Sequence, residues 1–80
     1  MKVRLSGVRR LCVDGEFIRL DRLMKLASLV STGGEAKVLI QGGEVFVDGE
    51  VCTMRGKKLR DGNVVRFGGD TLVVRTSAAT

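Results

Sequence analysis

The sequence has 80 residues, of which 44% are apolar and 29% are charged, so it can form one domain with one small core. Fourteen Lys and Arg against nine Asp and Glu give a net charge of +5, which favours a polyanionic partner. No apolar run approaches the roughly 20 residues of a membrane-spanning helix, and N-terminal arginines interrupt any secretory signal, so we expect a soluble, cytoplasmic protein.

The N-terminal segment is predicted to form two short strands, at about residues 2–6 and 9–13. Apolar and basic side chains alternate along the first of them, which is the two-residue period of a strand. Ser6-Gly7 and Asp14-Gly15 are turn signals at the ends of these strands. We expect residues 1–16 to be a strand extension of the single domain, 1–80.

A helix is predicted from about Leu20 to Val30. Its apolar residues recur at spacings of three and four, which places one stripe of the helix against a core. That stripe consists of Leu20, Leu23, Met24, Ala27 and Val30. Arg22 and Lys25 lie off the stripe, and Arg19 directly precedes the helix, so we expect its exposed side to be basic.

A second helix is predicted to start at Thr32. Thr32 followed three residues later by Glu35 is the spacing of a capping box, in which each side chain bonds the backbone N–H of the other residue. Gly42-Gly43 is predicted to end this helix. Lys37 and Gln41 should point away from its buried edge. Two helices this short need a sheet to pack against.

The C-terminal half is predicted to supply most of that sheet. Asp48-Gly49 is the dipeptide best suited to a two-residue type I′ turn, so it predicts a hairpin. The strands are expected at residues 44–47, 50–53, 64–67 and 71–75. Residues 76–80 should form a short frayed tail. The fold class is therefore α+β, with two helices on a small, mainly antiparallel sheet of about four to five strands.

Several classes of chemistry are disfavoured. The chain has no His and its acidic residues are scattered singly, so neither general acid–base catalysis nor a metal site is predicted. Gly33-Gly34 lacks the G-K-[ST] ending of a phosphate-binding P-loop. Cys12 and Cys52 are distant in sequence and form no zinc or redox motif. We expect no enzyme activity, no cofactor and no metal.

Two features favour nucleic acid. At the helix start Thr32–Gly34, unpaired backbone N–H groups without bulky side chains allow a phosphate to approach closely. The segment Arg55–Lys58, with Arg60 beyond it, carries four cations and no acid before Asp61. Each feature also has a plain structural reading, since two glycines permit a tight helix–helix turn and a charge run is usually a solvated surface.

The order of these blocks resembles the S4-like RNA-binding domain, a module of a ribosomal small-subunit protein, some tRNA synthetases, pseudouridine synthases and small stand-alone bacterial proteins. The resemblance covers residues 18–67, and the stand-alone bacterial group is the most similar. It is carried by the segments Ile18–Leu23, Gly34–Ile40, Gly42–Val51, Lys57–Leu59 and Asp61–Val65.

The resemblance implies an S4-like two-helix motif on a small sheet, with structured RNA bound by the helical face. Its contacting positions fall on Arg19, Arg22, Lys25, Lys37, Lys57 and Lys58. Our full set of candidate residues adds Thr32, Gly33, Gly34, Gln41 and Arg55. Many family members carry a basic residue where this chain has Gly33, which shifts the expected contact there to backbone amides.

The expected ligand is ribosomal or tRNA-like RNA, read by shape and phosphate contacts with weak sequence specificity. Phe17, Phe46 and Phe67 are the only aromatic residues, so the stacking platforms of single-strand binders are not expected. We expect a monomer, with ribosomal or RNA-processing proteins as further partners. The alternative is a protein-interaction adaptor whose basic face binds an acidic partner. A membrane-surface binder is disfavoured, because no basic amphipathic helix with bulky aromatics is predicted.

Overall fold

The structure, a computed structural model, describes residues 7–77. These residues form two helices, α1 (Leu20–Leu26) and α2 (Gly33–Gln41). They also form the strands β1 (Gly7–Val13), β2 (Ile18–Arg19), β3 (Val45–Val47), β4 (Glu50–Val51), β5 (Lys58–Leu59), β6 (Val64–Phe67) and β7 (Asp70–Thr76).

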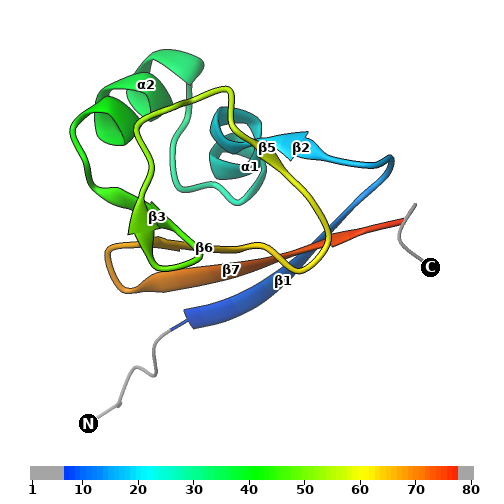
Figure 1. Cartoon of the computed structure of the whole chain (residues 1–80). Coiled ribbons are helices and arrows are strands. Elements are labelled where there is room, and N and C mark those ends of the chain that lie inside the picture. The colour runs from blue at the N-terminus through cyan, green and yellow to red at the C-terminus, as the bar shows by residue number, and fades with distance from the viewer. Residues whose placement is uncertain (1–6, 78–80) are drawn as a thin grey trace, which may run out of the picture.

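Five strands make one sheet in the order β1-β7-β6-β3-β4, and β2 pairs with β5 in a separate two-stranded sheet. Both helices lie on the same side of the larger sheet (Figure 1). All pairs in that sheet are antiparallel except β1 with β7. The α+β fold with a mainly antiparallel sheet of five strands is thus confirmed.

The N-terminal strand is longer than predicted and forms one edge of the larger sheet. It starts at Gly7, so Gly7 belongs to a strand rather than to a turn, while the strand expected over 2–6 lies outside the described residues. Strand β1 pairs with β7 in parallel from Gly7↔Asp70 to Val13↔Thr76. Sequence periodicity does not reveal this pairing, because it joins segments about 60 residues apart.

The first two residues of the expected tail, Thr76 and Ser77, are held in the fold. Thr76 is the last residue of β7 and is buried. Ser77 donates its backbone N–H to the Val13 carbonyl at 3.0 Å, and its hydroxyl accepts from the Gly15 N–H at 3.1 Å. The chain is therefore held through Ser77 by bonds to β1 and the turn after it, and 78–80 lie outside the described residues.

Helix α1 ends at Leu26, four residues before the predicted end. Ser28 adopts the left-handed conformation (φ 62°), its N–H bonds the Lys25 carbonyl at 3.0 Å, and the Leu29 N–H bonds the Met24 carbonyl at 2.9 Å. This bond pattern is a Schellman motif, which usually carries glycine at the left-handed position. A serine there gave no signal in the sequence.

Helix α2 starts where predicted, with the complete capping box. The Thr32 hydroxyl accepts from the Glu35 N–H at 3.1 Å, and the Glu35 carboxylate accepts from the Thr32 N–H at 3.2 Å. The same carboxylate accepts from the Ser31 N–H at 2.6 Å. The side chain of Glu35 is thus turned back over the helix start.

Replacing Thr32 by Ala is expected to lower stability by about 1 kcal/mol, because the Glu35 N–H loses its acceptor. In a domain of this size that corresponds to a fall in Tm of about 4–8 °C, measurable by circular dichroism. Glu35→Gln is the matched control, since glutamine keeps an oxygen acceptor in the capping box and should cost less. Equal Tm values for Thr32→Ala and the parent chain would contradict this role of the cap.

The predicted hairpin is confirmed. Asp48 and Gly49 have positive φ values of 50° and 88°, as a type I′ turn requires. The Asp48 carboxylate accepts from the Val64 N–H at 3.0 Å and from the Asn63 side-chain amide at 2.7 Å. These bonds join the hairpin turn to the start of β6.

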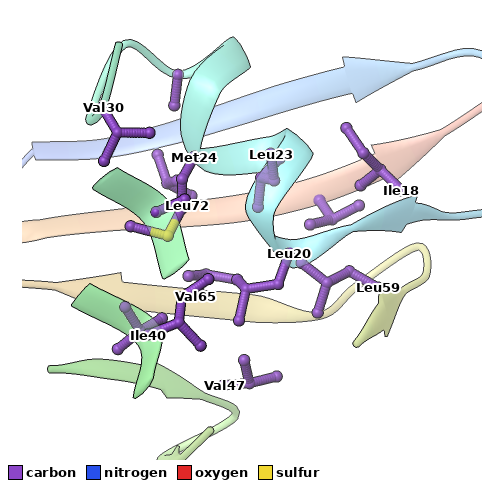
Figure 2. Packing of buried hydrophobic residues seen from close by; sticks show 14 residues of the cluster. Ile18, Leu20, Leu23, Met24, Val30, Ile40, Val47, Leu59, Val65 and Leu72 are labelled. Carbon is purple, nitrogen blue, oxygen red and sulfur yellow. The ribbon is translucent and has the colours of Figure 1, made fainter. Parts of the chain in front are cut away.

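The core lies between the helices and the larger sheet (Figure 2). The predicted stripe of α1 is buried throughout, including Ala27 and Val30 beyond the helix end. It packs with Ile40 of α2 against residues such as Val65 and Leu72 of the sheet. Ile18 of β2 and Leu59 of β5 close the core beside α1, in a two-residue strand pair that the sequence did not predict.

Candidate nucleic-acid interface

The basic segment Arg55–Lys58 is joined to the start of α1 by the backbone. Arg19, the N-cap of α1, makes no side-chain cap. Instead the Leu20 N–H donates to the Lys57 carbonyl at 2.9 Å and the Asp21 N–H donates to the Arg55 carbonyl at 3.0 Å. Since the first N–H groups of a helix have no partner within it, these carbonyls supply the missing acceptors.

The β2–β5 pair extends this junction. Arg19 and Lys58 are direct cross-strand partners in an antiparallel register. Gly56 also lies close to Arg19, since a Cβ at Gly56 would be 3.6 Å from the Arg19 guanidinium. In Figure 1 the segment that ends in β5 passes beside β2 and α1. The loop cations and the first cation of α1 are therefore neighbours.

A hollow of about 240 Å³ lies between α1 and the start of α2. It is lined by Arg19, Asp21, Arg22, Lys25 and Gly33. All three cations of the α1 region thus border one depression, and none of them is buried. A Cβ at Gly33 would meet no atom within 4 Å, so the α2 side of the hollow is open.

Asp21 is the carboxylate in this hollow, and it was not among the candidate binding residues. One of its oxygens lies 3.4 Å from the Arg19 guanidinium, and the other accepts from the Arg22 N–H at 2.8 Å. Asp21 therefore reduces the positive charge at Arg19. Among the described residues no ion pair is formed by Arg22 or Lys25, which leaves both charges available to a ligand.

The start of α2 faces the same hollow. In the capping box the Glu35 N–H donates to the Thr32 hydroxyl, so this N–H is not available to a ligand. The N–H groups of Gly33 and Gly34 come before the first hydrogen bond of the helix, so they have no acceptor within it. Lys37 follows Gly33 by four residues, and Gln41 follows by four more, so all three lie along one side of α2. Both side chains are exposed.

The loop lysines border a second, separate hollow. Lys57 and Lys58 line it together with Arg60, opposite Asp48 and Glu50 of the β3–β4 hairpin. Arg55 lines neither hollow, although its carbonyl caps α1. The predicted cations therefore do not form a single cluster. Arg19, Arg22 and Lys25 line the hollow at α1, Lys57 and Lys58 line the second hollow, and Lys37 and Arg55 line neither.

Phe17 and Arg60 were absent from the predicted set. The Phe17 ring is 39% exposed, with the Lys58 ammonium 4.8 Å and the Arg60 guanidinium 5.6 Å from its centroid. The signal available in the sequence was the alternation around β2, since Ile18 is buried whereas Phe17, just before the strand, and Arg19 are exposed.

No group of three possible metal ligands occurs within residues 7–77. Both cysteines are free thiols, Cys12 exposed and Cys52 half-buried. None of the helices in the described part of the chain has the length and apolar character needed to cross a membrane.

Comparison with known proteins places these features in a family. Residues 11–75 match the model of the S4 domain family. The chain is also 40% identical, over 57 residues, to a Bacillus subtilis (strain 168) protein named "Probable ribosome maturation protein RlbA". The aligned segment covers 71% of this chain and 80% of that protein. Together with the two helices on a small sheet, these matches establish that the chain belongs to the S4 domain family.

Proposed function

We propose that this protein binds structured RNA through the side formed by α1, the start of α2 and the loop Arg55–Lys58. The observation that carries this proposal is the backbone junction between the loop and α1. Through the bonds from Leu20 and Asp21, a segment distant in sequence is fixed beside the cations of α1. A charged surface held in place in this way loses little conformational freedom on binding.

The proposed contacts are mainly with phosphates. Arg22, Lys25 and the loop lysines are exposed long side chains, which suit phosphate contacts at the surface of a folded RNA. Phosphate contacts position a protein without reading sequence, so specificity should come from the shape of the RNA. At the start of α2, the open space at Gly33 supports a contact from backbone N–H groups.

Ribosomal RNA is the proposed target class, since the Bacillus subtilis relative is named for ribosome maturation. We propose that the protein acts in the cytoplasm as a monomeric, non-enzymatic binding module. Its role would be to recognise a folded RNA site, alone or beside ribosomal or RNA-processing proteins.

The affinity for an RNA hairpin is expected to fall steeply with salt. If about four to six cations contact phosphates, log K should fall with log salt with a slope of roughly −3 to −5. A fluorescence-anisotropy titration between about 50 and 200 mM salt measures this slope. An affinity that does not change over this range would contradict phosphate binding.

Replacing Lys57 and Lys58 together by Ala is expected to weaken hairpin binding at least about tenfold and to make the salt slope less negative by about 2. Both side chains are exposed, so Tm should change little. The matched control is Arg10→Ala with Arg66→Ala, which removes the same charge from the opposite side of the sheet. Equal losses in the two double variants would show that only net charge matters and would remove the loop from the interface.

Copurification with and without RNase distinguishes RNA from a protein partner. Ribosomal material should be lost from the protein when RNA is destroyed. An acidic protein that stays bound after RNase treatment would favour an adaptor instead.

A further inference from the structure

A hollow of about 480 Å³ adjoins the proposed RNA-binding side on the flank of α1. Its walls come from the end of β1, from β2 and from α1, and they include Asp14, Phe17, Arg19, Arg22 and Leu26. Arg19 and Arg22 also line the hollow between α1 and α2. The two depressions thus share a border of two cations, and an RNA lying on α1 would reach both.

Two large apolar side chains are left exposed in this hollow. Phe17, directly before β2, is 39% exposed. Leu26, the last residue of α1, is 54% exposed. Exposed apolar residues that gather in one concave site, rather than singly, indicate a surface for a ligand with an apolar face. A volume of about 480 Å³ is within the range of small-ligand sites.

The Phe17 ring is also held in place by cations. Lys58 and Arg60 lie 4.8 and 5.6 Å from its centroid, but neither lines the hollow. Phe17 itself lines the hollow and is 39% exposed, so part of this side chain remains accessible from the hollow. The two cation contacts restrict the ring without adding positive charge inside the hollow.

The hollow is lined by charges of both signs. Arg19 of β2 and Arg22 of α1 attract a phosphate, whereas the Asp14 carboxylate after β1 repels one. A carboxylate can instead accept a hydrogen bond from the amino group of a base. A nucleotide would therefore place its phosphate at the arginines and its base between Phe17 and Leu26.

We propose that this hollow receives one unpaired nucleotide of the bound RNA, with its base stacked on Phe17. The inference rests on the proposed function, since the phosphate of that nucleotide belongs to an RNA held on α1. It adds a requirement that phosphate contacts alone do not impose: the preferred RNA carries an unpaired base beside a folded helix. Because an unpaired base can stack on an aromatic ring, the protein should prefer an RNA that offers such a base.

The first test compares two RNA hairpins that differ by a single unpaired nucleotide in the stem. The parent chain should bind the bulged hairpin at least about fivefold more tightly than the fully paired one. Phe17→Leu keeps an apolar side chain but removes the aromatic face, so it should reduce this preference, the ratio of the two affinities, below about twofold. Val38→Ala on α2, another exposed apolar position, is the control and should keep the full preference.

A second variant gives a direct signal from the site. The chain contains no Trp and no Tyr, so Phe17→Trp introduces one fluorophore at the proposed stacking position. The bulged hairpin should quench its fluorescence, and the paired hairpin should not. Quenching by free nucleoside monophosphates at the concentrations where the hairpin acts would overturn the assignment to a nucleotide within RNA.

The outcomes separate the two proposals. Tight, salt-dependent binding of both hairpins with equal affinity and no quenching would overturn the nucleotide site and leave the proposed function standing. If neither hairpin binds, the proposed function fails, and the nucleotide site fails with it.

Discussion

Removing residues 1–16 is expected to abolish cooperative unfolding of this domain or to lower its Tm by more than about 10 °C. Strand β1 pairs with β7 along its whole length, and Leu11 and Val13 pack against the core from this strand. The Arg9 guanidinium also donates to the Ala27 carbonyl at 2.9 Å, beside the end of α1. A domain of 80 residues has only about 4–12 kcal/mol of stability, so losing an edge strand should remove a large share of it.

Thermal melting and gel filtration of the shortened chain measure this effect. The exposed edge of β7 should also promote association between chains. Two double variants of β1 serve as matched controls in the full chain. Leu11→Ser with Val13→Ser changes the side toward the helices and should destabilise strongly, whereas Val8→Ser with Cys12→Ser changes the exposed side and should not. An unchanged Tm in the shortened chain would mean that β1 is an accessory element.

Replacing Leu23 by Ala is expected to lower stability by about 2–5 kcal/mol, the usual range for leucine deletions in a core. Leu23 is fully buried in the middle of α1 and faces the sheet, so its removal leaves a cavity that neighbouring side chains fill only in part (Figure 2). In a domain of this size the Tm should fall by at least about 10 °C. Denaturant titration would give the free energy of unfolding directly.

Leu26→Ala is the matched control, because it is the same substitution one turn later on the same helix. Leu26 is 54% exposed, so its loss should change stability by less than about 1 kcal/mol. Similar losses for the two variants would show that the sheet-facing side of α1 is not the centre of the core.

The parts of the fold that were predicted correctly depend on local signals. The capping box of Thr32 and Glu35 fixed the start of α2, and Asp48-Gly49 fixed the hairpin turn. Both signals act between residues three positions apart or fewer. The buried stripe of α1 was predicted correctly for the same reason, since its spacing is a property of the helix itself.

The features that were missed depend on contacts between distant segments. The β2–β5 pair has two residues in each strand, too few for any periodicity, and the parallel partner of β1 lies at the other end of the described chain. The end of α1 was placed too late because Ser28, not glycine, takes the left-handed position. For the candidate site, residue types and family resemblance identified the cations, while their division between two hollows depends on the hairpin opposite Lys57.

The backbone bonds that start α1 have a consequence for how this surface can vary. The acceptors at positions 55 and 57 are carbonyls, which every amino acid provides, so they constrain the path of the loop but not its chemistry. Only the donors are restricted, because proline at position 20 or 21 would lack the N–H. Related or redesigned chains could therefore exchange loop side chains to suit another RNA while keeping the same scaffold.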